Sequence, residues 1–156
     1  MSGALALRAL GALDLDIAAA LHADAFAALG EARWSRRDLA ELMASPGVAG
    51  LLIEADRQPV GFALWRRAAA EAELLTLAVS PTHRRRGAGG RLVAAVVRNA
   101  REAGAIELFL EVGIDNLPAL SLYEKAGFFK VGCRAAYYHR AAGPAADAVV
   151  MRLGLA

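Results

Sequence analysis

The chain has 156 residues, of which 57% are hydrophobic and 22% charged, a balance typical of one globular domain with a hydrophobic core. Its formal net charge is only +2, so whole-protein attraction to nucleic acid is weak and we expect no direct nucleic-acid binding. A single cysteine excludes an internal disulfide and a cysteine-built metal site. The N-terminus lacks a signal-peptide pattern, and charges interrupt each apolar stretch before membrane-spanning length. We expect one domain over residues 1–156, located in the cytoplasm and not bound to a membrane.

A strand and two helices are expected at the start of the chain. Residues 4–8 form a short apolar strand candidate. Asp14 can cap a helix that ends near Gly30, with Ile17 on its apolar face. Ser35 opens a second helix as part of a capping-box variant.

Three strands and an amphipathic helix are expected next. Residues 48–54, 60–67 and 71–79 have the pattern of strands separated by turn residues, which predicts an antiparallel meander. After Leu92, apolar residues recur on one helical face, and Gly104 is placed to end that helix.

The last third of the chain alternates between strand and helix patterns. Over residues 106–112 apolar and other residues alternate with the period of a strand, which places Glu111 on the face opposite Leu108. A helix capped by Asn116 and two strands follow, at residues 116–126, 128–138 and 148–153. The whole pattern predicts a mixed α/β (α+β) sheet protein.

The segment from His83 to Leu92, HRRRGAGGRL, lies directly between a strand and a helix. Gly87 and Gly89 allow backbone conformations that let several N–H groups converge on one anion at the helix N-terminus. The arginines can add charge-assisted hydrogen bonds. No Lys-Ser or Lys-Thr follows the glycines, and Leu92 replaces the third glycine of the dinucleotide fingerprint, so the sequence favours neither ATP nor NAD. A solvated patch or an RNA contact is the alternative, but no aromatic residues are interleaved with the arginines.

This segment resembles the signature of the GNAT superfamily of acyl-CoA-dependent N-acetyltransferases, because Arg84 to Gly89 fits its pattern of Arg or Gln, two variable residues, Gly, any residue, then Gly or Ala. The order of expected elements is also similar. The resemblance implies a mostly antiparallel central sheet of about seven strands flanked by about four helices, with acetyl-CoA as co-substrate. The positions that would bind the coenzyme are Leu77, Ala78, Val79, Arg84, Arg85, Arg86, Gly87, Ala88, Gly89, Gly90 and Asn116.

Several separated pieces are similar to the ribosomal-protein-alanine N-acetyltransferases within that superfamily. They are Arg33–Ser35, Leu110–Val112 with Asn116, Leu122–Glu124 with Gly127 and Phe128, and Tyr137–Tyr138 ahead of Asp147 and Ala148. The resemblance implies Glu111 as general base and Tyr123 as proton donor, with Trp34 and Tyr138 near a peptide N-terminus. The expected partner is a ribosomal protein. Gly90, where relatives commonly carry Arg, and residues 141–146 depart from the family pattern.

General chemistry makes the role of Glu111 reasonable. An α-amino group has a pKa of about 8, so a modest base suffices to take its proton directly or through one water. Tyr123 is a weaker candidate as an acid, because proton transfer from a phenol of pKa near 10 to a thiolate whose thiol has a pKa near 8.5 costs free energy. The alternative role is a hydrogen bond from Tyr123 to the leaving sulfur. Packing is the alternative for Tyr123 and Trp34 alike.

Other polar residues indicate no further chemistry. Cys133 is expected to be a small buried residue rather than a nucleophile, because no histidine lies near it in the sequence. The three histidines are scattered, so we expect no metal. Three functions remain open: acetylation of a protein N-terminus, acetylation of a small amine or amino acid, and acyl-CoA or partner binding without turnover.

Overall fold

A computed structural model describes residues 4–31 and 34–156 of the chain. Seven strands form one sheet in the order β1-β2-β3-β4-β5-β7-β6, and all neighbouring pairs are antiparallel except β4 and β5. The strands are β1 (Leu5–Ala9), β2 (Val48–Ala55), β3 (Gln58–Ala68), β4 (Glu71–Val79), β5 (Glu107–Gly113), β6 (Phe129–Tyr138) and β7 (Ala146–Gly154). The four helices are α1 (Leu15–Phe26), α2 (Arg36–Ala44), α3 (Ala88–Glu102) and α4 (Leu117–Lys125). The expected fold is confirmed.

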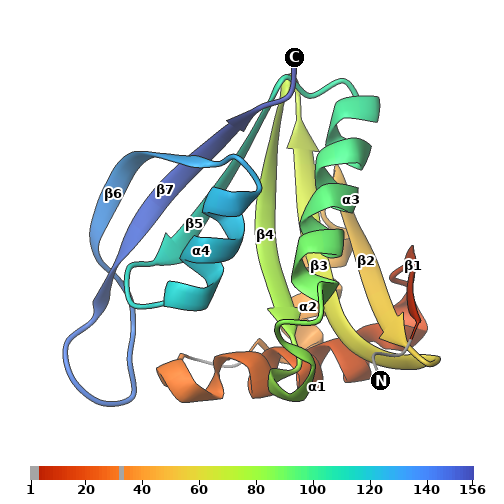
Figure 1. Cartoon of the computed structure of the whole chain (residues 1–156), viewed down its shortest axis with the longest axis horizontal. Coiled ribbons are helices and arrows are strands. Elements are labelled where there is room, and N and C mark those ends of the chain that lie inside the picture. The colour runs from red at the N-terminus through yellow and green to blue at the C-terminus, as the bar shows by residue number, and fades with distance from the viewer. Residues whose placement is uncertain (1–3, 32–33) are drawn as a thin grey trace.

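The helices divide between the two faces of the sheet (Figure 1). The helices α3 and α4 pack on one face, where the core includes Leu92, Leu108 and Tyr123. The helices α1 and α2 cover part of the other face, with Leu21, Leu39 and others against the middle strands. Within the described ranges, no helix is both long and apolar enough to cross a membrane.

The expected helix-terminal residues are largely confirmed. The hydroxyl of Ser35 accepts a hydrogen bond from the backbone N–H of Asp38, and the Asp38 carboxylate accepts one from the Ser35 N–H. The Asn116 side chain accepts a hydrogen bond from the Ala119 N–H at the start of α4. Gly104 has a left-handed φ of 95° just after α3. Local sequence therefore positions these three helices.

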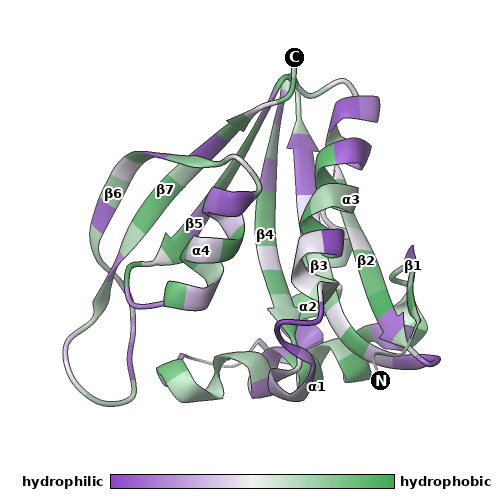
Figure 2. Ribbon diagram, in the orientation of Figure 1, coloured by the Kyte–Doolittle hydropathy of each residue, from purple (hydrophilic) through white to green (hydrophobic). Residues whose placement is uncertain are grey.

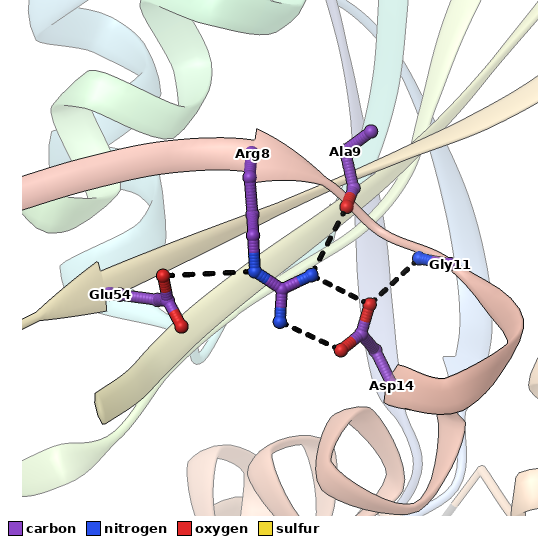
Figure 3. Close-up of polar contacts among 5 residues, drawn as sticks. All are labelled: Arg8, Ala9, Gly11, Asp14 and Glu54. Atoms are coloured by element: carbon purple, nitrogen blue, oxygen red, sulfur yellow. Dashed lines mark hydrogen bonds and ion pairs between the residues drawn. The ribbon is translucent and has the colours of Figure 1, made fainter. Parts of the chain in front are cut away.

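Asp14 occupies the N-cap position of α1, as expected, but its side chain forms no capping hydrogen bond to that helix. Its carboxylate instead accepts hydrogen bonds from the guanidinium of Arg8 at 2.8 and 2.9 Å and from the Gly11 N–H at 2.8 Å (Figure 3). Those bonds lower the Asp14 pKa to about 2. Arg8 also lies 3.7 Å from Glu54, so the group ties β1, β2 and the start of α1 together. The cap failed because a stronger charged partner competes for the same carboxylate.

Two burial predictions were wrong. Ile17 is 41% exposed, because the buried face of α1 is formed by other residues such as Leu21 and His22. Cys133 is exposed on β6, since that strand lies at the edge of the sheet with most of its residues open to solvent. Edge position, which the sequence pattern did not reveal, decides the exposure of Cys133.

The strands β4 and β5 run together at one end and separate toward the other (Figure 1). Their parallel pairing extends from Glu71 opposite Glu107 to Leu74 opposite Leu110 and goes no further within the described chain. A bulge at this level shifts the register of β3 against β4 between Leu64 and Trp65. The second half of β4 therefore hydrogen-bonds to β3 on one side only, and its other edge is free.

Candidate active site

Glu111 lies at the point where β4 and β5 separate. It follows Leu110, the last residue of β5 that pairs with β4. Its neighbours Leu110 and Val112 are buried against the α3 face, whereas the Glu111 side chain points to the other face and is 18% exposed. The predicted alternation is confirmed, and it places a carboxylate beside the free edge of β4.

The free part of β4 contains Leu77, Ala78 and Val79. Leu77 and Val79 pack toward the α3 side and Ala78 toward the α1 side. Their outer backbone N–H and C=O groups, unlike those of a central strand, are not paired with β5. An extended ligand can therefore form main-chain hydrogen bonds to this edge.

The arginine and glycine segment lies at the same end of the sheet, directly before α3. It is hydrophilic in contrast to the apolar end of β4 (Figure 2). Arg85 and Gly87 both have left-handed backbones, with φ of 62° and 88°, so the loop turns sharply into the helix. The first hydrogen bond of the helix runs from the Arg91 N–H to the Gly87 carbonyl. The N–H groups of the first turn are thus directed out of the helix end, where they can bind an anion.

The three arginines of this loop have different surroundings. Arg84 donates a hydrogen bond of 2.7 Å to the Ala25 carbonyl near the end of α1, so it holds the loop against that helix. All three arginines are exposed, but the guanidinium of Arg84 is already bonded to α1. Of the three, Arg85 and Arg86 are positioned to reach a negatively charged ligand in solution.

The glycines of the loop also differ in what they permit. A β-carbon on Gly89 would lie 3.1 Å from the Leu122 side chain of α4, so this glycine lets α3 and α4 approach closely. A β-carbon on Gly87 or Gly90 would meet no atom within 4 Å, and Gly87 is needed for its positive φ instead. Ala88 is buried. Gly89 thus positions α4, which carries Asn116 at its N-terminus and Tyr123 near its end.

An open cavity of about 350 Å³ lies on the sheet beside Glu111. Its lining includes Arg66, Glu73, Phe109, Glu111 and Arg134. The Arg134 guanidinium lies 3.0 Å from the Glu111 carboxylate, but its side chain is 57% exposed. Because an exposed ion pair contributes little free energy, an incoming cation can displace Arg134 from Glu111 at small cost.

Tyr123 is buried in α4, with its ring against Phe128 at 5.9 Å between centroids. Burial raises the pKa of its hydroxyl. A raised pKa makes the phenol a weaker acid, so the mismatch with a thiolate is larger than the sequence suggested. The arrangement favours hydrogen-bond donation over proton transfer.

Tyr138 lies at the end of β6, and its hydroxyl donates a hydrogen bond of 3.1 Å to the Glu111 backbone carbonyl. Burial is the main cause that raises its pKa, and the nearby charges of Glu31 and Glu111 raise it further. The Tyr123 hydroxyl contributes to the same shift. The hydrogen bond joins the end of β6 to β5 at Glu111.

An ion pair that the sequence did not indicate closes this region. The Arg140 guanidinium forms two hydrogen bonds, 2.7 and 2.8 Å long, with the Asp115 carboxylate. The Arg140 side chain is only 6% exposed and lies over the Tyr138 ring at 5.5 Å. Asp115 directly precedes the cap residue Asn116, so the pair fixes the segment after β6 to the start of α4. No local pattern links residues 25 positions apart, which is why this contact was missed.

Trp34 is half-buried between α1 and α2. Its ring stacks on His22 at 5.0 Å with an angle of 16°, and its backbone N–H donates to the His22 ring at 3.4 Å. His22 is 2% exposed, and burial lowers its pKa to about 4, so it is neutral near pH 7. Packing therefore explains much of Trp34. Arg33, which was part of the same expected motif, lies outside the described residues.

Among the described residues, no group of three His, Cys, Asp or Glu side chains is placed to hold a metal ion.

Comparison with known proteins agrees with this geometry. A family model described as the acetyltransferase (GNAT) family matches residues 16–128, which is well over half of the chain. The chain belongs to the GNAT acetyltransferase family. It is therefore an acetyltransferase, and acetyl-CoA is the acetyl donor of its family.

Individual relatives of this acetyltransferase have two kinds of name. The ribosomal protein bS18-alanine N-acetyltransferase of Salmonella typhimurium is 36% identical over 103 residues, 66% of this chain and 69% of that protein. The mycothiol acetyltransferase of Clavibacter michiganensis is 37% identical over 133 residues, 82% of this chain but only 44% of that protein. Among solved structures, the ribosomal-protein-S18-alanine N-acetyltransferase from Escherichia coli has a TM-score of 0.88 at 27% identity, covering 98% of this chain and 95% of that one.

Proposed function

We propose that this acetyltransferase transfers the acetyl group of acetyl-CoA to the N-terminal alanine of a ribosomal protein. The observation that carries the proposal is the position of Glu111, a carboxylate directly beyond the last β4–β5 pair and beside the free edge of β4. A base at this point is adjacent to any acyl group held along that edge.

The chain's own residues fit acetyl-CoA. The free backbone groups of residues 77–79 suit the amide-containing arm of the coenzyme. The N-terminus of α3, with exposed Arg85 and Arg86, suits its pyrophosphate. Asn116 would contact the coenzyme from the start of α4 while it also caps that helix. The coenzyme supplies an activated thioester, and no covalent enzyme intermediate is required.

Glu111 would act on the incoming amine. The incoming ammonium first loses one proton to solvent, which leaves a neutral amine. As the amine nitrogen attacks the acetyl carbon, the new C–N bond forms, the C–S bond breaks and the electron pair leaves with sulfur. The nitrogen then loses one proton, which Glu111 accepts directly or through one water. Displacement of the exposed Arg134 by the incoming ammonium frees the carboxylate for this task.

Tyr123 would stabilise the leaving sulfur. Because burial raises its pKa, Tyr123 keeps its proton and donates a hydrogen bond rather than the proton itself. The thiolate, with a pKa near 8.5, then takes a proton from solvent.

The acceptor is inferred from both chemistry and similarity. An α-amino group needs only a modest base, and one carboxylate beside the thioester meets that need. The Escherichia coli structure named for ribosomal protein S18 aligns with nearly all of this chain, and the alignment also includes nearly all of that structure. Trp34 and Tyr138, on opposite sides of Glu111 in the sequence, would contact the peptide N-terminus.

A small-molecule acceptor is the second candidate. The relative named for mycothiol matches more of this chain than the ribosomal relative does, although this chain spans less than half of its length. Binding of acyl-CoA without turnover is the third possibility, and Glu111 with Tyr123 argues against it.

The test is release of free coenzyme A from acetyl-CoA in the presence of alanine-starting peptides or small amines. We expect turnover with the peptides, and Glu111→Gln should lower kcat by about 10²- to 10⁴-fold without weakening acetyl-CoA binding. Activity on small amines alone would favour the second candidate. Intact acetyl-CoA binding with no turnover of any acceptor would overturn the proposal.

Glu107→Gln is the matched control for this experiment. Glu107 lies on the same strand and also pairs with an arginine at 3.0 Å, but at the far end, where β5 is paired with β4. This variant should keep nearly the kcat of the unmodified enzyme. An equal loss in both variants would mean that the effect is structural.

A further inference from the structure

The edge strand β6 contains a bulge close to the candidate active site. Before the bulge, Arg134 of β6 stands opposite Ala148 of its neighbour β7, and both strands lie at one side of the sheet (Figure 1). After the bulge, Tyr138 stands opposite Ala146. Three residues of β6 therefore face Asp147 alone, where a regular ladder would have one. The register of the two strands shifts by two residues at this point.

The register shift decides where Tyr138 lies relative to Glu111. Without it, Tyr138 would stand opposite Pro144, before the start of β7. That displacement of two residues corresponds to about 7 Å along the strand. The Tyr138 hydroxyl, which donates a hydrogen bond of 3.1 Å to the Glu111 carbonyl, would then lie out of reach of it. The bulge is therefore what brings Tyr138 to Glu111.

Asp147 satisfies the backbone of this bulge. Extra residues in a bulge are left without partners in the ladder, and here Oδ1 of Asp147 accepts a hydrogen bond of 2.8 Å from the Ala136 N–H. Ala136 has a left-handed φ of 48°, which is unfavourable for a residue with a β-carbon. The backbone carbonyl of Asp147 accepts a second hydrogen bond, of 2.9 Å, from the Ile114 N–H just after β5. Asp147 thus joins the bulge to the end of the strand that carries Glu111.

The side chains in and beside the bulge form one group. The ring of Tyr137, inside the bulge, lies 5.0 Å from the Tyr138 ring at an angle of 81°. The Arg134 guanidinium lies over the same Tyr137 ring at 5.2 Å, and it lies 3.0 Å from the Glu111 carboxylate. A change in the shape of the bulge would therefore displace all three side chains next to Glu111.

We propose that Asp147 is a positioning residue of the acceptor side, which holds the β6 bulge in the register that brings Tyr138 to Glu111. Tyr138 then fixes the backbone of Glu111 and so the direction of its carboxylate. The inference rests on the proposed function, because Glu111 matters here as the base for the acceptor amine. Asp147 acts through the backbone of β6, so its accepting oxygen is required and its charge is not.

The test compares Asp147→Ala with Asp147→Asn in steady-state kinetics with an alanine-starting peptide. Asp147→Ala should lower kcat/KM for the peptide about tenfold, because a small displacement of groups around the base is costly. Asp147→Asn should retain most of kcat/KM, because its amide oxygen can accept the same hydrogen bond. An equal loss in both variants would show that the charge of Asp147 matters rather than this bond, and would overturn the proposal.

Two changes at Ala136 test whether Asp147 acts through the bulge. Glycine adopts a positive φ without strain, so Ala136→Gly combined with Asp147→Ala should recover at least threefold of the lost kcat/KM. Ala136→Val places a β-branched residue at this φ and should reproduce the loss while Asp147 is intact, which also gives an answer if Asp147→Ala does not fold. No recovery with Ala136→Gly, or unchanged kinetics in Ala136→Val, would contradict the proposed route.

Asp14→Ala is the matched control. The Asp14 carboxylate also accepts a backbone hydrogen bond of 2.8 Å, from the Gly11 N–H, and it binds Arg8 as well. It lies just after β1, at the opposite edge of the sheet from β6. This variant should lose stability but keep kcat/KM for the peptide. A loss as large as that of Asp147→Ala would assign the effect to reduced stability and overturn the positioning role.

Hydrogen exchange of the Ala136 amide, followed by NMR, tests Asp147 without any acceptor. We expect about tenfold faster exchange in Asp147→Ala and nearly unchanged exchange in Asp147→Asn. If the unmodified protein acetylates no alanine-starting peptide, the proposed function fails, and the exchange rates still show whether Asp147 holds the bulge. If exchange in Asp147→Ala is unchanged, the role of Asp147 is overturned whatever the turnover. Acetyl-CoA affinity, expected to be equal in all variants, shows that each one is folded.

Discussion

The proposed donor side and the proposed acceptor side of this enzyme are built in different ways. The donor side is one continuous stretch, from the free half of β4 through the arginine loop into the first turn of α3, residues 75–90. The acceptor side is assembled from distant parts of the described chain: residues 30–31 and Trp34, residues 111–116, and residues 138–141. They meet through the Gly30–Ala141 hydrogen bond and the Arg140–Asp115 ion pair.

Because of this difference, the two sides tolerate sequence changes to different degrees. A continuous stretch that starts in a central strand and ends in a buried helix is held by the core on both sides. A site that depends on contacts between loops changes whenever one loop changes, even if the sheet stays intact. Acceptor preference can therefore diverge among relatives while the donor stays the same, which agrees with the different acceptors for which the relatives are named.

We expect the largest effect from Gly89→Leu, which should weaken acetyl-CoA binding on the donor side. A side chain at this position would push against Leu122 and force α4 away from α3. Overpacking of this kind costs up to about 3 kcal/mol, which corresponds to roughly 100-fold weaker acetyl-CoA binding if the cost falls on the bound state. Calorimetric titration with acetyl-CoA measures it.

Ala94→Leu provides the control for that change, because Ala94 is exposed on the same helix. It creates the same side chain at an exposed position and should bind acetyl-CoA normally. Unchanged affinity in Gly89→Leu would show that the close approach of α3 and α4 does not matter for the donor side.

A smaller effect is expected from mild acid, which should lower the stability of the protein through His22, the residue packed against Trp34 on the acceptor side. His22 has a pKa of about 4 in the folded protein and about 6.5 when unfolded, so the unfolded state binds the additional proton first. Stability is therefore complete above pH 6.5 and declines as the pH falls toward 4. Between pH 6.5 and pH 5 we expect a loss of up to about 2 kcal/mol in the free energy of unfolding.

Urea unfolding at these two pH values measures the loss, and His22→Leu should remove most of it. Asp14 contributes its pH dependence only below its unfolded pKa of 3.8, outside this interval. Glu31 has the opposite sign, because its raised pKa favours the folded state in acid, but it is present in both proteins. An equal loss in both proteins would assign the acid sensitivity to another group. The comparison of the two proteins thus separates the effect of His22 protonation from the effect of its packing against Trp34.

The smallest effect is expected from Asp14→Asn, which lies on neither side. The variant loses the charged contact with Arg8 that joins β1 to the start of α1. Since the Arg8 side chain is 44% exposed, the pair contributes little and we expect Tm to fall by only a few degrees. Neither acetyl-CoA affinity nor peptide KM should change. A change in either would mean that the two sides are coupled through α1.

Sequence reasoning reached most of the fold for identifiable reasons. The apolar period of α3, the capping box at Ser35 and the cap at Asn116 depend on neighbours within a few residues. The predictions of a side-chain cap by Asp14 and of burial for Cys133 were wrong. The Asp14 carboxylate binds Arg8 on another element, and Cys133 lies on an edge strand, which only the strand order shows. The roles given to Glu111 and Tyr123 remain predictions, and the raised pKa of Tyr123 favours hydrogen-bond donation over the proton transfer that the resemblance implies.

The sequence by itself determined the class of the fold and an anion-binding loop before a helix, because both follow from local period, glycine conformation and residue spacing. That the anion is an acyl-CoA follows from the resemblance of Arg84 to Gly89 to the family signature. Tertiary structure alone decided where β4 separates from β5, that Arg84 of the loop is bonded to α1, and that Arg140 pairs with Asp115 while Tyr138 bonds to Glu111. The physical reason is distance along the chain. Contacts between residues 25 to 110 positions apart arise from strand order and loop packing, and no period in the sequence encodes them.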